Sequence, residues 1–182
     1  MDFSPTAEFS LLLACCRPQT DPETLVRQRA LLAQIDPAGF LALVDRHRVA
    51  PMVCHHLLQL PPDSVPVALT APLRDRQRAA VLRQLEMTRE QLRLHQLFGT
   101  AGIAYVTLKG LPLAQRYYGN AGLRTSKDID VLVAPHQLDA AEAALLAAGY
   151  VPDDGFDRIT PRQRIHWLKA FHHCSFAAPG SG

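Results

Sequence analysis

Apolar residues recur every three to four positions through the first part of the chain, with polar residues between them. This spacing is typical of amphipathic helices. Two Asp-Pro pairs, at residues 21–22 and 36–37, mark helix starts, because Asp caps a helix and Pro suits its first position. A long amphipathic segment follows over residues 67–98. We therefore predict a helical lobe over residues 1–99.

The pattern changes at Gly99, after which short apolar runs alternate with helical segments. The runs over residues 103–108 and 128–133 have the length of strands. The other predicted elements are a helix over 111–118, a helix over 135–148, a short strand at Val151, a loop and short helix over 158–169, and a strand over 171–177. The chain as a whole is therefore predicted to be α+β, with an α/β core over residues 100–182.

Composition and charge narrow the classes of protein that fit. The chain has 182 residues, of which 48% are hydrophobic and 20% charged, which is ordinary for a globular protein. No apolar run approaches the length that crosses a membrane, so membrane insertion is excluded. The net charge of +2 is too small to favour nucleic acid as the partner. The four cysteines have no disulfide-framework spacing, so we expect reduced thiols and a cytoplasmic location.

Asp128 and Asp130 begin the second predicted strand. Side chains at i and i+2 of a strand share a face, about 6.6 Å apart along the chain. Two carboxylates placed in this way can share two divalent ions about 3.5–4 Å apart, an arrangement used for phosphoryl displacement. An isolated Asp-x-Asp is a weak signal, because Asp is common at strand starts. Here two like charges on one face repel unless a cation compensates them, so we favour a metal site over a purely structural pair.

Lys109 and Gly110 lie where the first predicted strand passes into a helix. Glycine there lets backbone amides approach a phosphate, and the helix N-terminus adds positive potential. Lys109 could hold a phosphate as a point charge. The alternative is a surface lysine beside an ordinary turn glycine. The position just ahead of the Asp pair favours the phosphate interpretation.

Other residues near the Asp pair also suit a nucleotide. Arg124 can clamp a triphosphate with two hydrogen bonds, and Ser126 can donate one. The alternative is a solvated loop in which basic residues such as Lys127 offset the aspartates. Tyr117 and Tyr118 could stack on a base, although helical periodicity places one of them in the core.

Two Cys/His triplets, at residues 54–56 and 172–174, raise the question of zinc. Neighbouring residues on a helix or strand point in different directions, so neither triplet forms a ligand set by itself. Their spacing matches no structural zinc pattern. We therefore predict no zinc site.

A family pattern is carried by Leu108-Lys109-Gly110, Leu113, Tyr117-Tyr118, Leu123-Arg124 and Asp128-Ile129-Asp130-Val131-Leu132-Val133. This combination resembles the uncharacterised nucleotidyltransferase family of the polymerase-beta-like superfamily. The resemblance is close over residues 101–150, and the helical first half resembles the family in pattern only. It implies a mixed sheet flanked by helices. It also implies transfer of a nucleoside monophosphate from a nucleoside triphosphate (NTP) to an acceptor, with release of pyrophosphate.

The resemblance also implies roles for residues. Two strand aspartates bind magnesium in that superfamily, which assigns both Asp128 and Asp130 as metal ligands and catalytic residues for two Mg²⁺ ions. A glycine turn between strand and helix holds the triphosphate. The predicted nucleotide ligands are Lys109, Gly110, Arg124 and Ser126.

Two departures from the superfamily pattern stand out. The usual Gly-Ser or Gly-Gly is Gly110-Leu111 here, so the turn has no serine hydroxyl and Lys109 is its substitute. A third carboxylate, expected on the strand after the predicted strand over 171–177, is not visible. Asp153, Asp154 and Asp157 are predicted to lie in a loop and are poor substitutes. We therefore expect the chain to be a fragment or a truncated family member.

Three functions remain open on the sequence. The first is a metal-dependent nucleotidyltransferase whose acceptor is a small molecule or protein rather than nucleic acid. The second is a catalytically impaired nucleotide-binding or protein-interaction module of the same fold, with the helical lobe as interface. An exposed strand edge over residues 171–177 would favour a homodimer in that case. The third is a toxin-like enzyme that nucleotidylates protein or tRNA.

Overall fold

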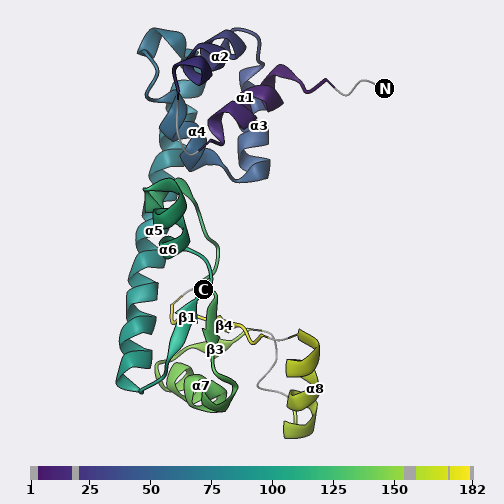
Figure 1. The fold of residues 1–182 in the computed structure, drawn as a ribbon, viewed down its shortest axis with the longest axis vertical. Coiled ribbons are helices and arrows are strands. Elements are labelled where there is room, and N and C mark those ends of the chain that lie inside the picture. Colours follow the sequence, from purple (N-terminus) through teal and green to yellow (C-terminus); the bar gives the residue numbers. More distant parts are fainter. Residues whose placement is uncertain (1–3, 18–20, 154–158, 172, 181–182) are drawn as a thin grey trace. The chain divides into compact units, whose positions relative to one another are not determined.

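A computed structural model describes residues 4–17, 21–153, 159–171 and 173–180 (Figure 1). The elements are α1 Ala7–Cys15, α2 Pro22–Leu32, α3 Pro37–His47, α4 Ala50–Leu57, η1 Pro62–Ser64, α5 Val67–Thr100, β1 Tyr105–Thr107, α6 Leu111–Tyr118, η2 Ala121–Leu123, β2 Val131–Val133, η3 Pro135–Gln137, α7 Leu138–Ala147, β3 Val151–Pro152, α8 Pro161–Phe171 and β4 Phe176–Ala177. The predicted α+β class is confirmed.

The helical lobe is built from α1 to α4 and the first turns of α5. Its predicted caps are confirmed, because Asp21 accepts a hydrogen bond from the Thr24 amide at 2.6 Å and Asp36 accepts one from the Gly39 amide at 2.7 Å. Each cap is followed by proline in the first turn. The fully buried large side chains of its core are Leu11, Phe40, Val44, Val53, Leu57, Leu69 and Leu73. This apolar core holds the lobe together.

Two residues of the triplet over residues 54–56, Cys54 and His56, are buried in this lobe, and His55 is half-buried. His56 is 1% exposed, with Nε2 2.8 Å from the Arg17 carbonyl oxygen and Nδ1 3.4 Å from the Gln28 side-chain nitrogen. A neutral ring that donates from Nε2 and accepts at Nδ1 satisfies both contacts. Burial lowers the pKa of His56, which favours that neutral form. Cys54 donates to the Leu73 carbonyl, and burial raises the pKa of Cys54 to about 11.

A second, smaller core lies around the end of α5. Phe98, Ile103 and Ala141 are buried there, and side chains from both β1 and β2 pack against them. β1 pairs with β2, and β3 pairs antiparallel with β4 in the register Val151↔Ala177. The described strands therefore form two separate pairs, whereas the resemblance implied one mixed sheet.

The strands are shorter than the sequence pattern predicted. β2 begins at Val131, so Asp128 and Asp130 lie in the irregular segment that precedes it. Phe171 ends α8 rather than starting a strand, and β4 is confined to residues 176–177. Pairing partners decide where a strand begins, and the alternation of apolar residues does not contain that information.

Contacts divide the chain into two compact units. The first contains the residues described up to Thr88 together with Thr107–Asp130, and the second contains Arg89–Val106 with those described from Val131 onward. Residues 107–130, which carry every predicted site residue, thus associate with the helical lobe. The division of the chain into a lobe over 1–99 and a core over 100–182 concerns independent folding and stays a prediction.

The middle of α5 carries exposed apolar side chains. Leu82, Leu85 and Leu92 are 62%, 62% and 59% exposed, although their helical spacing predicted a buried face. Leu94, further along the same helix, is buried as its place in the apolar pattern predicts, and Phe98 is buried as well. Among the helices of the described ranges, none combines the length and the apolar character needed to cross a membrane.

Candidate functional site

The turn between β1 and α6 is shaped by Gly110. Its φ of 84° and ψ of −140° lie close to a backbone region that is essentially restricted to glycine. A Cβ placed on Gly110 would meet no atom of the described structure within 4 Å, so conformation rather than crowding demands glycine here. Gly110 is the N-cap of α6, as predicted. Pro112 occupies the first turn, so that turn offers one amide fewer than usual.

Lys109 and Asp130 are brought together by the backbone. The Leu108 amide donates to the Asp130 carbonyl at 3.0 Å, which continues the β1–β2 pairing by one residue. Lys109 Nζ then lies 2.8 Å from Asp130 Oδ2. The two atoms form an ion pair by distance, although their orientation falls outside hydrogen-bond geometry. This ion pair joins the lysine-glycine turn directly to the predicted metal ligand.

The ion pair is asymmetric in its exposure. The Lys109 side chain is 58% exposed and the Asp130 side chain 33% exposed, with Oδ2 shielded from solvent. Close contact with Asp130 raises the pKa of Lys109 most, and the charge of Asp128 adds to this, while the charge of Arg124 lowers it. The charges of Asp130, Asp128 and Arg124 therefore all act on Lys109. Together with Lys109 they comprise two cations and two anions within one unit of the chain.

Asp128 is exposed and lies in a bend. Ser126 Oγ donates to the Asp128 carbonyl oxygen at 2.9 Å, which fixes the shape of that bend. The hydroxyl is therefore already engaged, and a phosphate would have to compete for it. Nothing in the strand register places the two aspartates on one strand face, since both precede β2.

Arg124 follows η2 and is partly buried. Its Nη1 atom is shielded from solvent and has no hydrogen-bond partner within the described part of the chain. A shielded cationic donor without an acceptor is costly. An anion that reached this nitrogen would relieve the cost, which is what a triphosphate clamp requires.

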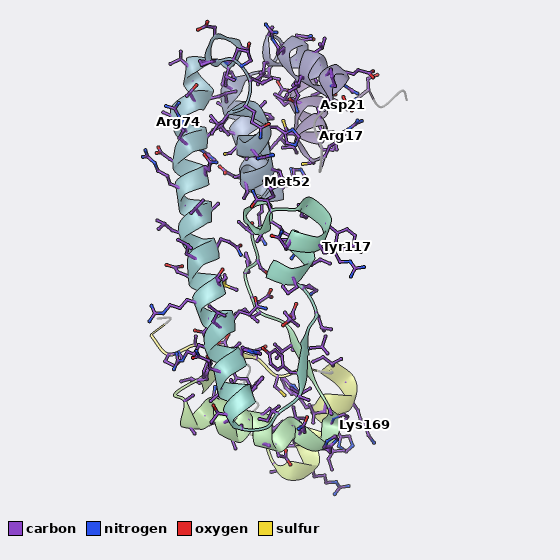
Figure 2. The ribbon with its side chains drawn as sticks, turned by 60° about the vertical axis from the view of Figure 1, so that its left-hand side comes forward. Arg17, Asp21, Met52, Arg74, Tyr117 and Lys169 are labelled. Carbon is purple, nitrogen blue, oxygen red and sulfur yellow. The ribbon has the colours of Figure 1, made fainter. Side chains whose placement is uncertain are left out.

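The helical lobe supports this segment. η2 packs against α4 and against α6, and Leu123 at its end is 7% exposed. Met52 lies on α4, the helix that contacts η2 (Figure 2). Because Arg124 directly follows Leu123, the lobe helps to fix the position of the arginine. Sequence reasoning missed this support, since no local signal links α4 to η2.

The other residues considered from the sequence are the two tyrosines of α6, the aspartates after β3 and the second Cys/His triplet. Tyr117 is 65% exposed and projects outward from α6, while Tyr118 is half-buried (Figure 2). Tyr118 is the more buried of the two, but it belongs to neither core cluster, so the prediction that one of them lies in the core is not borne out. Asp153 follows β3 and its amide donates to the Ser175 carbonyl, and Asp154 and Asp157 lie outside the described residues. His172, in the second Cys/His triplet, also lies outside them.

Comparison with known proteins gives one result for this chain. A family model described as "uncharacterised nucleotidyltransferase" matches residues 33–176, which is most of the sequence. The chain belongs to this family. No curated protein and no solved structure matches it. The resemblance inferred from residues 108–133 is confirmed at the level of the family.

The matched range of this nucleotidyltransferase-family chain, residues 33–176, includes every predicted site residue. Nucleotidyltransferases generally use a divalent metal and an NTP. Within the described ranges, no three His, Cys, Asp or Glu side chains gather into a metal cluster. Mg²⁺ is commonly held by one or two carboxylates together with substrate phosphates rather than by an all-protein cage. Asp128 and Asp130 are two carboxylates that lie two residues apart in the segment before β2.

Proposed function

We propose that this chain binds an NTP together with Mg²⁺ and transfers its nucleoside monophosphate to an acceptor, with release of pyrophosphate. The observation that carries the proposal is the Lys109–Asp130 ion pair beside the Gly110 turn. A half-buried carboxylate, an exposed ammonium and a helix N-terminus lie near one another there. Phosphoryl transfer needs such groups, because its catalysis is mostly positioning and charge neutralisation.

Each residue has a role in the proposal. Asp128 and Asp130 hold the metal, here taken as two Mg²⁺ ions, which when bound neutralise charge on the triphosphate. Lys109 and the amides after Gly110 contact the phosphates. Arg124 supplies its unpartnered Nη1 to a phosphate oxygen. Ser126 shapes the bend around Asp128 and reaches a phosphate only by giving up its present hydrogen bond.

The acceptor is proposed to be a small molecule or a protein. The net charge of +2 offers little attraction to a nucleic acid backbone. We also propose a cytoplasmic location, because the four cysteines have no disulfide-framework spacing.

A nucleotide-binding module without transfer is the second candidate. The observation that favours it is that Asp128 and Asp130 are the sole acidic residues of the sequence between 107 and 130. A third carboxylate that activates the acceptor hydroxyl would have to come from elsewhere. Such a module would bind the metal-nucleotide complex and act through a partner or a second copy of the chain.

The test is NTP binding with and without Mg²⁺, measured by calorimetry. Asp128→Asn combined with Asp130→Asn should abolish the Mg²⁺-dependent part of binding. Asp63→Asn combined with Asp75→Asn is the matched control, because these exposed carboxylates lie elsewhere in the same unit and lose the same charge. Unchanged Mg²⁺-dependent binding in the first variant would refute the site. A pyrophosphate-release assay on the parent chain distinguishes the two candidates, because the transferase releases pyrophosphate and the nucleotide-binding module does not.

A further inference from the structure

Asp130 and its cation have unequal freedom to move. The backbone of Asp130 is held in place, because its main-chain carbonyl oxygen accepts a hydrogen bond from the amide of Leu108, the residue after β1. Lys109 reaches the Asp130 carboxylate with a flexible side chain that is 58% exposed. An exposed ammonium on a four-carbon stem can leave one partner for another within reach. The carboxylate is the fixed member of the pair and the lysine is the movable one.

The ion pair supplies a positive charge beside Asp130 that the sequence pattern alone did not predict. Asp128 and Asp130 were expected to need a metal because like charges repel. In the structure Lys109 already compensates Asp130 through their ion pair, and the negative charge of Asp128 also acts on Lys109. The carboxylates can therefore coexist before any metal binds. A metal that approaches Asp130 must compete with the ammonium for the same oxygen.

We propose that Lys109 is an exchangeable counter-ion, which occupies the cation position on Asp130 until metal and nucleotide arrive and then transfers to the triphosphate. This inference rests on the proposed function. It makes Lys109 a positioning residue with two alternating partners, the Asp130 carboxylate and a phosphate. The nucleotide supplies the new partner that the displaced ammonium needs.

The exchange couples metal binding to nucleotide binding. Without NTP, Lys109 weakens metal binding to Asp130, because a metal that displaces the ammonium leaves the ammonium with no carboxylate partner. With NTP, the ammonium gains phosphate oxygens and this weakening disappears. Coupling of this kind is reciprocal, so each ligand raises the affinity for the other by the same factor. The site then binds free metal less tightly than it binds metal together with the nucleotide.

The experiment measures Mn²⁺ affinity by water-proton relaxation, with and without NTP. Lys109→Met should bind Mn²⁺ alone about two- to fivefold more tightly than the parent chain, the factor expected for a partly exposed ion pair. In the presence of NTP its affinity should fall below that of the parent. Lys109→Gln should behave in the same way, and Lys109→Arg should keep the weak binding of free metal because it keeps the cation.

Lys127→Met is the matched control. It removes one positive charge from the residue adjacent to Asp128, and Lys127 is exposed. If it raises Mn²⁺ affinity as much as Lys109→Met does, the effect is general electrostatics and the inference is wrong. The inference is also wrong if neither Lys109→Met nor Lys109→Gln gains affinity for free metal while the parent chain still binds metal and NTP together. If the parent chain shows no metal-dependent NTP binding, the proposed function fails as well.

Discussion

A half-buried carboxylate needs a nearby positive charge, and at Asp130 the chain supplies it from Lys109 at 2.8 Å. The same lysine adjoins Gly110, whose backbone conformation starts α6. Three groups that could contact a metal-bound triphosphate are thus close together: a carboxylate, a cation and a helix N-terminus. At the residue scale, the proposed function depends on whether the turn keeps this arrangement.

Gly110→Ala tests the turn. The φ of 84° and ψ of −140° are strained for any residue with a Cβ, so we expect a loss of about 1–3 kcal/mol in the free energy of unfolding. We also expect weaker NTP binding, because the backbone must shift away from the phosphate position. Urea unfolding and an NTP titration measure the two effects.

Gly99→Ala is the control for this substitution. Gly99 is the next-to-last residue of α5, and a Cβ there would meet no atom of the described residues within 4 Å. Alanine in a helix interior is favoured over glycine by up to about 1 kcal/mol, so this variant should be as stable as the parent or more so. Equal effects at both glycines would show that the turn conformation has no special role.

At the scale of elements, local signals and long-range pairing differ in how well the sequence reveals them. The caps of α2 and α3 and the full extent of α6 follow from Asp, Pro and Gly at fixed offsets, and all were predicted correctly. The start of β2 depends on its partner, and the prediction extended it to Asp128. The Lys109–Asp130 contact was missed for the same reason, because it requires the register of two paired strands. The exposure of Leu85 likewise depends on which elements reach α5, and periodicity alone does not tell this.

The contact between η2 and α4 gives a test at this scale. Leu123 is 7% exposed and immediately precedes Arg124. Leu123→Ala should cost about 2 kcal/mol of stability, at the lower end of the range for buried leucine. It should also weaken NTP binding, because the arginine loses its anchored neighbour. Thermal unfolding and calorimetric titration measure the two quantities.

Leu85→Ala makes the same chemical change at a position that is 62% exposed. Its stability should stay within about 0.5 kcal/mol of the parent, and NTP binding should not change. A Leu123→Ala variant that binds NTP as well as Leu85→Ala does would show that the lobe does not position Arg124.

At the scale of the whole molecule, the helical lobe and the candidate site belong to one compact unit. Residues 107–130 associate with the residues described up to Thr88, and the remaining α/β elements form the other unit. α5 contributes to both, with Val67–Thr88 in the first and the residues from Arg89 in the second. A ligand that binds the site should therefore stabilise the lobe more than the second unit.

Hydrogen exchange tests this division directly. With Mg²⁺ and a non-hydrolysable NTP analogue at about 100 times the dissociation constant, the unit that binds gains about 2.7 kcal/mol. Its most protected amides should then exchange about 100-fold more slowly, in α4 and α6 as well as in α5 before Thr88. Amides of α7 should change much less, because Leu138–Ala147 belongs to the other unit. Equal slowing in α4 and α7 would mean that the chain unfolds as one cooperative body. Slowing in α7 alone would place the ligand outside residues 107–130.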